Sequence, residues 1–181
     1  MFLSLVEKRR SIRRYQEKPV EAEKVDMLVE TALRSPSSRG FNPWEFVIVN
    51  DRDLLAKLSK AKPHGASFLK NASLGIVVCA DPEKCDVWVE DASIASIFLH
   101  LMSESLGLGS CWIQIRKRIH DQTKSAPAYV QELLNIPEKL QVESIIAIGY
   151  PAESKPAHRK EDLQYEKVHY NEYGKPYDVQ S

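Results

Sequence analysis

The feature that most constrains the fold is one long segment with a helical pattern that is apolar on nearly every side. Residues 87–106 place apolar side chains around almost the whole circumference of a helix. Gly107 follows directly, and glycine is the usual left-handed residue after a helix end. A helix of this kind needs cover on every side, so we expect it to be buried at the centre.

Strand-like and helix-like segments alternate along the rest of the chain. Residues 74–80 form a continuous apolar run, which indicates a strand covered on both faces. The remaining patterns predict strands at 44–49, 110–115 and 142–150, and helices at 20–33, 54–58 and 128–134. We therefore predict an α/β (α+β) fold with a mixed sheet of four or five strands surrounded by helices.

Length and charge narrow the class of protein. The 181 residues, 43% of them apolar, are enough for one core and show no linker, so we expect a single domain over 1–181. The 25 basic residues balance the 25 acidic ones, which argues against nucleic acid as a partner. No run approaches the ~20 apolar residues of a membrane span, and the first residues lack a signal-peptide pattern. We expect a cytoplasmic protein without a membrane partner.

The cysteines and histidines give no support for a metal or redox centre. Cys79, Cys85 and Cys111 are odd in number and lack the C-x-x-C spacing, so we interpret them as reduced structural thiols. The five histidines are scattered, and no glycine-rich nucleotide motif occurs. We therefore predict no metal ligands.

Arginines cluster near the start of the chain. Arg9, Arg10 and Arg13 surround Ser11, and guanidinium groups beside a hydroxyl suit the oxygens of a phosphate. The alternative is a solvated basic patch, since most Lys and Arg side chains are simply exposed.

The end of the chain differs from the rest. Residues 151–181 are charged and contain spaced tyrosines, and they are too polar to form a core. Aromatic side chains on such a segment need a surface to lie on, and a partner subunit would supply it. A loosely attached tail is the alternative.

Four segments together resemble the FMN-dependent nitroreductase-like oxidoreductases. The sequence KRRSIRRY at 8–15 is similar to the family's R-R-S-x-R-x-F/Y opening, and SPSSRGFNPWEFV at 35–47 to its P-S-x-x-N-x-Q-P-W segment. LGLGSCWI at 106–113 and AIGYP at 147–151 match two further motifs, with the basic pair Arg159 and Lys160 after them. The order and spacing cover nearly the whole chain, as in a short, compact member of that family.

The resemblance implies FMN as the cofactor. Its phosphate would be held by Arg13 and Arg159, helped by Lys160, while Arg9, Arg10 and Ser11 would approach the pyrimidine edge and the ribityl chain. A positive group near the pyrimidine stabilises the negative charge of reduced flavin.

Main-chain atoms of Gln114 and Ile115 would lie near flavin N5. The alternative for Gln114 is an ordinary polar residue at a strand end. Lys70 and His64 are weaker candidates for the substrate entrance.

The resemblance also implies an intertwined homodimer with its active sites at the interface. Pro36, Ser37 and Ser38 would come from the second subunit and close over the flavin, and residues 151–181 would wrap the partner. Two positions depart from the family pattern: Gly40 stands where the family has asparagine, and Asn42 where it has glutamine. These changes put the affinity for FMN and the substrate preference in question.

The implied function is hydride transfer from NADH or NADPH through flavin N5 to a small acceptor such as a nitroaromatic or a quinone, in a ping-pong sequence. The chemistry would belong to the cofactor, so we predict no side chain as acid, base or nucleophile. The alternatives are a non-enzymatic FMN-binding or storage protein and a specialised flavin enzyme that dehalogenates a metabolite or fragments the flavin.

Overall fold

The computed structural model describes residues 2–177. It contains helices α1 (Phe2–Lys8), α2 (Ala22–Leu33), α3 (Arg52–Leu58), α4 (Trp88–Ser105) and α5 (Ala126–Leu134). The strands are β1 (Trp44–Val49), β2 (Leu74–Ala80), β3 (Gly109–Gln114) and β4 (Gln141–Gly149). Short 3-10 turns lie at η1 (Ser38–Gly40), η2 (Ser67–Asn71), η3 (Lys160–Asp162) and η4 (Tyr165–Lys167).

The four strands form one sheet in the order β1-β2-β4-β3. Each neighbouring pair is antiparallel, and parallel pairing is confined to a bridge between Ser11 and Ser110 at the edge of β3. The predicted α/β fold and strand number are therefore confirmed, but the sheet is antiparallel where we expected a mixed one. Periodicity locates strands and carries little information about their direction.

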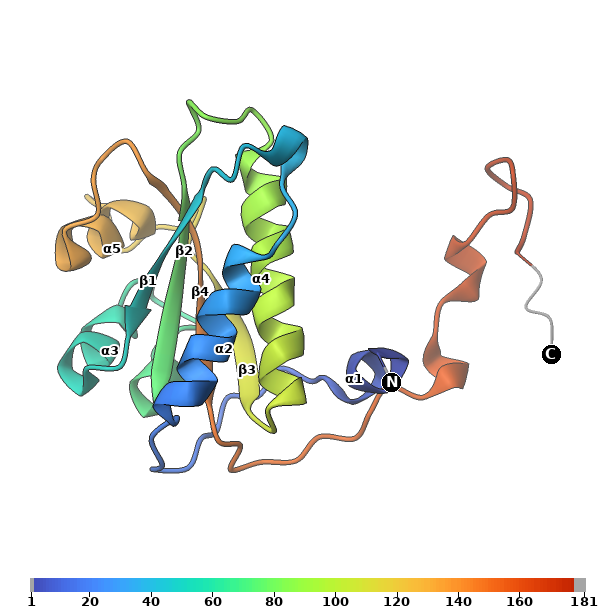
Figure 1. The fold of residues 1–181 in the computed structure, drawn as a ribbon, viewed down its shortest axis with the longest axis horizontal. Helices are drawn as coiled ribbons and strands as arrows, with labels where there is room; N and C mark the ends of the chain where they lie inside the picture. Colours follow the sequence, from blue (N-terminus) through green and yellow to red (C-terminus); the bar gives the residue numbers. More distant parts are fainter. Residues whose placement is uncertain (1, 178–181) are drawn as a thin grey trace.

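Helices cover both faces of the sheet (Figure 1). α2 and α4 lie on one face, and α3 and α5 on the other. The central strands β2 and β4 are buried almost throughout, as the apolar run at 74–80 predicts. β1 and β3 are the edge strands, so each has one side that no described strand occupies.

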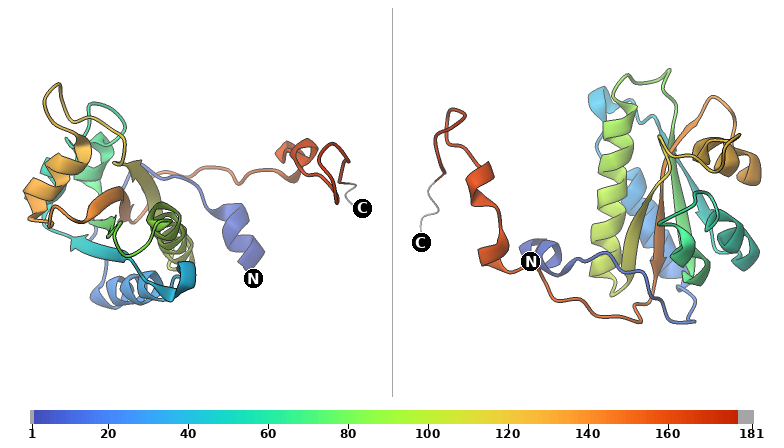
Figure 2. Two further views of the ribbon diagram at one scale, coloured as in Figure 1. Left: turned by 90° about the horizontal axis from the view of Figure 1, so that it is seen from above. Right: turned by 180° about the vertical axis from the view of Figure 1, so that it is seen from behind.

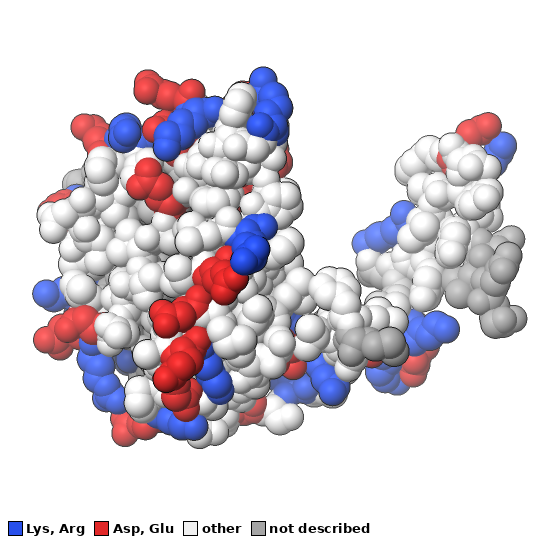
Figure 3. All heavy atoms as spheres, in the orientation of Figure 1, with Lys and Arg blue, Asp and Glu red and all other residues white. Residues whose placement is uncertain are grey.

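The long helix α4 is buried on one side only. Ala92, Ala95 and Leu99 are fully buried against the sheet, while Ile94 and Ile97 remain 36% and 43% exposed. Figure 3 shows a largely uncharged surface over α4, beside a line of charges along α2. Apolar side chains thus lie on several sides of α4, as the sequence predicts. The expected burial on every side is not found within one chain, because Ile94 and Ile97 are exposed.

The C-terminal segment runs away from the body of the molecule (Figure 2). Tyr170, Tyr173 and Tyr177 are 59%, 93% and 43% exposed. Residues 178–181 of the predicted extension lie outside the described residues. Among the described residues, no helix is long and apolar enough to cross a membrane.

Candidate active site

The arginine cluster lies against the open edge of β3. The amide of Ile12 donates a hydrogen bond to the Ser110 carbonyl at 3.0 Å, and Ser11 forms the parallel bridge with Ser110. A Cβ atom on Gly109 would come within 2.7 Å of Ile12 Cγ2, so the close approach requires glycine at this position. The sheet thus fixes the segment that carries Arg9, Arg10 and Arg13.

A buried histidine of α4 contacts Ser110, the β3 residue that pairs with the arginine segment. His100 Nδ1 lies 2.7 Å from Ser110 Oγ, and the side chain is 5% exposed. Burial lowers the pKa of His100 to about 4, with a further contribution from the positive charge of Arg9. The ring is therefore neutral at pH 7 and adds no positive charge to the arginine cluster.

Residues 153–156 pack beside the arginine cluster. The amide of Arg13 donates to Glu153 Oε1 at 2.6 Å, Lys155 Nζ donates to the Ser11 carbonyl at 2.5 Å, and the Arg10 guanidinium donates to the Pro156 carbonyl. Glu153 contacts main-chain amides of the cluster and forms no ion pair with its guanidinium groups. Within residues 2–177, Arg9, Arg10 and Arg13 form no ion pair with a carboxylate.

Arg159 and Lys160 lie on the outlying segment that follows. Arg159 donates to Asp162 through Nε at 2.8 Å and through Nη2 at 2.6 Å, and this contact raises its pKa. Arg159 is three positions after Pro156, a span of about 10 Å when extended. Among residues 2–177, the pair forms no hydrogen bond with Arg9, Arg10 or Arg13, and the Arg159 side chain turns to Asp162.

The end of β3 presents one free amide. The Ser110 carbonyl faces the open edge, so the two-residue alternation of an antiparallel strand turns the Gln114 N–H to the same edge. The Ile115 amide already has a partner within the sheet, because it donates to the Glu143 carbonyl at 3.1 Å. The Gln114 side chain accepts from Trp112 Nε1 at 3.0 Å and donates to the Arg116 carbonyl at 3.1 Å. Of the two predicted positions, Gln114 offers the amide.

The loop at 36–42 lies elsewhere, at the start of α4. The Ser38 amide donates to Asp91 Oδ1 at 2.8 Å, and Ser37 Oγ both accepts from the Asn42 amide and donates to Asn42 Oδ1. Gly40 and Asn42 have φ angles of 68° and 48°. Asparagine tolerates this left-handed region better than glutamine, which gives a backbone reason for Asn42, whereas the φ angle of Gly40 would also suit the family's asparagine.

The two halves of the predicted site do not meet within one chain. The loop contacts Asp91 in the first turn of α4, while His100 and Ser110 mark the other half. Nine residues of helix separate Asp91 from His100, which corresponds to roughly 14 Å along the axis. The structure therefore holds Arg9–Arg13 at the Ser110 end of β3, and leaves Pro36, Ser37, Ser38 and Asn42 at the far end of α4 (Figure 1). Gln114 is at the other end of β3 from Ser110, and the turn after it reaches the first turn of α4, where the Arg116 guanidinium lies 5.5 Å from the centre of the Trp88 ring.

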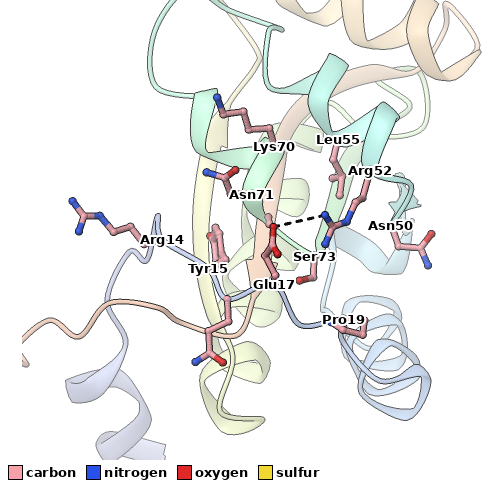
Figure 4. Close-up of a pocket in the computed structure, with 12 residues that line it drawn as sticks. Arg14, Tyr15, Glu17, Pro19, Asn50, Arg52, Leu55, Lys70, Asn71 and Ser73 are labelled. Atoms are coloured by element: carbon pink, nitrogen blue, oxygen red, sulfur yellow. Dashed lines mark ion pairs between the residues drawn. The ribbon is translucent and has the colours of Figure 1, made fainter.

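A hollow of about 580 Å³ lies next to the arginine cluster (Figure 4). Its wall is formed by residues 14–19 and 70–73 and by the start of α3, and it contains Lys70 but none of the predicted flavin-binding residues. Arg52 and Glu17 face each other there at 4.0 Å. Lys70 lines this hollow and His64 does not, and the role of either residue at the substrate entrance stays a prediction.

The three cysteines agree with the interpretation as reduced structural thiols. Cys79, Cys85 and Cys111 are free and buried. Burial raises the pKa of Cys79 to about 12 and also raises that of Cys111. No group of three or more potential metal ligands occurs among residues 2–177.

The sequence did not identify Phe68, whose ring centre lies 5.7 Å from the Arg13 guanidinium, because its position depends on how η2 packs.

Comparisons with known proteins agree with this geometry. A sequence model of the Nitroreductase family matches residues 6–82 and 62–150. An FMN-dependent nitroreductase from Clostridium difficile R20291 superposes with a TM-score of 0.93 at 49% identity, covering 94% of this chain and 99% of that one.

Two curated relatives are similar over most of their length. A protein of Archaeoglobus fulgidus named "Putative NADH dehydrogenase/NAD(P)H nitroreductase" is 37% identical over 88% of this chain and 91% of its own length. The FMN reductase [NAD(P)H] of Bacillus subtilis is 26% identical over 90% of this chain and 72% of its own. With its arginine-lined β3 edge and a family match spanning most of its length, the chain belongs to the nitroreductase family.

Proposed function

We propose that this NAD(P)H-dependent oxidoreductase binds FMN along the open edge of β3 and transfers electrons to a small acceptor. The observation that carries the proposal is the set of arginines held beside Ser110 without carboxylate partners, with the Gln114 amide four residues further along the same edge of β3. A phosphomonoester carries nearly two negative charges at neutral pH, so this donor set fits its phosphate.

Each residue has one task in this proposal. Arg13 binds the phosphate with Arg159 and Lys160, and Arg9 and Arg10 supply positive charge near the pyrimidine ring. The Gln114 amide donates a hydrogen bond at the reactive side of the ring. When bound, FMN would supply hydride transfer at N5 from NADH or NADPH to a nitroaromatic, a quinone or a similar acceptor in a ping-pong sequence.

The proposed site is completed by a second copy of the chain. Ile94 and Ile97 leave an apolar strip on α4 that a partner would cover, and the loop at 36–42 is available to close over the partner's cofactor. Obligate dimers bury well over ~2,000 Å² in total and cover apolar faces of this kind.

The C-terminal extension 151–181 would wrap that partner as part of the single domain. An apolar groove of about 340 Å³ lies between α2 and the open edge strand β1, with Trp44 in its wall. Apart from Glu45, the side chains that line this groove are apolar, so it offers apolar cover to a docking segment. The exposed tyrosines of the extension have the amphipathic character that suits it.

Anaerobic mixing of the flavin-loaded protein with NADH and with NADPH tests the function. We expect the flavin absorbance to bleach with at least one nicotinamide, and to return when a nitroaromatic or a quinone is added. Free FMN at the same concentration is the control. A protein that holds FMN but is reduced by neither nicotinamide would favour the storage alternative.

A further inference from the structure

Strand β4 contains a bulge at Glu143. Its pairing with β2 passes from Val78 opposite Ser144 directly to Cys79 opposite Val142, so Glu143 has no partner residue in β2. A bulge of this kind redirects a side chain and occurs often beside active sites. The redirected side chain of Glu143 is 4% exposed.

Both the main chain and the side chain of Glu143 contact the turn after β3. Its carbonyl accepts from the amides of Ile115 at 3.1 Å and Arg116 at 3.0 Å. Its Oε1 accepts from Gln114 Nε2 at 3.3 Å, and Arg116 Nε lies 3.7 Å from Oε2. One residue therefore touches all three residues of the turn that carries the free amide.

The carboxylate is not fully satisfied by these contacts. Oε2 is buried and has no hydrogen-bond partner among residues 2–177. The charged and titratable groups that face it are Arg116 from the turn and Glu90 from α4, beside the amide of Gln114. Burial raises the pKa of Glu143, because desolvation outweighs the contacts with Gln114 and Arg116. An amide or apolar side chain would be cheaper to bury, so stability alone does not account for glutamate here.

We propose that Glu143 is a positioning residue for hydride transfer, which holds the Gln114–Arg116 turn so that the Gln114 amide faces the flavin. The proposal rests on the proposed function. It assigns Glu143 no contact with the cofactor and no proton transfer. Misplacement of a reacting group by about 1 Å can slow a reaction by roughly a hundredfold, so a loosened turn should be visible in the rate.

Three variants test this role in the flavin-loaded protein. Glu143→Ala removes the carboxylate, Glu143→Gln keeps its shape without the charge, and Glu90→Gln is the matched control on α4. We expect Glu143→Ala to slow anaerobic flavin reduction at saturating NAD(P)H by about tenfold or more. Glu143→Gln should fall between Glu143→Ala and the wild type, and Glu90→Gln should behave as the wild type. FMN affinity should stay close to wild type, because the phosphate contacts are untouched.

Hydrogen exchange supplies a readout that needs no turnover. The amides of Ile115 and Arg116 should exchange faster in Glu143→Ala than in the wild type, and remain unchanged in Glu90→Gln. Wild-type exchange at these amides together with a wild-type reduction rate in Glu143→Ala would overturn the positioning role. A wild-type protein that NADH and NADPH cannot reduce would instead overturn the proposed function, and the exchange result would still decide whether Glu143 holds the turn.

The stability of the Glu143→Gln variant distinguishes a positioning role of Glu143 from a purely structural one. Because the folded-state pKa of Glu143 is raised, its ionisation costs stability, and the cost is complete above that pKa. Glu143→Gln should therefore unfold at a higher denaturant concentration than the wild type at pH 7, with a smaller difference at pH 4. A slower reduction rate in a more stable protein supports positioning, whereas parallel loss of rate and stability would indicate structural support only.

Discussion

At the scale of single residues, neighbouring arginines have different surroundings. The amides of Arg13 and Arg14 both donate to Glu153, but the Arg13 guanidinium lies over the Phe68 ring, whereas Arg14 lines the separate hollow of Figure 4. Charge and residue type are the same at both positions. The difference is therefore one of placement, and it can be measured.

We expect Arg13→Ala to weaken FMN binding much more than Arg14→Ala. A charge-assisted contact with a phosphate contributes about 1.5 to 3 kcal/mol, or roughly a ten- to hundredfold change in Kd. Fluorescence titration of the apoprotein measures both values, and Arg14→Ala is the matched control. Equal affinities of the two variants would contradict the assignment of the phosphate to Arg13.

Some residues of the candidate site can be identified from the sequence, and others cannot. The arginines and Gln114 follow from local motifs and from their place at a strand end. Glu143 and Phe68 do not, because their positions depend on a bulge and on the packing of η2 against the first residues. A bulge shifts register by one residue and leaves almost no mark on hydrophobic periodicity.

At the scale of elements, the contact between the first residues and β3 depends on Gly109. We expect Gly109→Ala to push Ile12 away from the strand, since the new Cβ would lie 2.7 Å from Ile12 Cγ2 and 2.8 Å from its Cβ. The arginine cluster should move with Ile12, and FMN affinity should fall by about tenfold, the effect of losing one charge-assisted contact.

Gly75→Ala is the control for crowding elsewhere in the sheet, where the nearest atom is Leu55 Cδ2 at 3.1 Å. It should lower the unfolding midpoint without a specific loss of FMN. Tight FMN binding by Gly109→Ala at wild-type stability would show that the cluster does not need this contact.

A second element-scale prediction concerns Tyr150, which joins the end of β4 to the start of α2. Its hydroxyl donates to Glu21 at 2.7 and 2.9 Å, and this contact, with Lys18 and Lys24 nearby, lowers the pKa of Glu21 from 4.5 to about 2. A lowered folded-state pKa stabilises the protein above the ordinary pKa, and the effect disappears as the pH falls through the folded value.

Tyr150→Phe should therefore reduce the free energy of unfolding at pH 7, and the difference from wild type should narrow between about pH 4.5 and pH 2. Tyr129→Phe is the control, because its hydroxyl donates to the Lys57 carbonyl and to no carboxylate. Chemical denaturation at several pH values measures both. A Tyr150→Phe deficit that does not change with pH would rule out the link through Glu21.

Element bounds were predictable to within a residue or two where periodicity was strong. β1 and β2 match the expected ranges, and α4 differs by one residue at each end. α5 begins at Ala126, earlier than the apolar pattern indicates, because the Ser125 side chain caps it by accepting from the Ala128 amide. α2 begins at Ala22, so Pro19 precedes the helix without starting it.

At the scale of the whole molecule, several surfaces lack cover within one chain. They are the Ile94 and Ile97 side of α4, the groove beside β1, and the extension that carries Tyr170, Tyr173 and Tyr177. The sequence predicts that α4 is buried on every side, and the described residues bury it on one side. Which residues of a second copy would meet the rest cannot be deduced from periodicity, because docking depends on shape.

Truncation after Glu166 should weaken dimerisation and lower FMN content. It removes the three exposed tyrosines and leaves Arg159 and Lys160 in place, so it separates packing of the extension from phosphate binding. Sedimentation velocity and the flavin-to-protein absorbance ratio measure the two effects. A truncated protein that dimerises and holds FMN as well as the full chain would contradict a wrapping role.

The most direct test of the composite site is complementation between two defective chains. Arg13→Ala impairs the phosphate contact, and Ser38→Trp blocks the loop that would close over the partner's cofactor. A mixed dimer carries one site with both defects and one with neither, if each site takes its two halves from different chains. Coexpression with two affinity tags isolates that dimer, and FMN is added at a concentration that loads neither parent. We predict that the mixed dimer binds FMN at about half of the wild-type content, one intact site in two; a mixed dimer as empty as its parents would contradict a site shared between subunits.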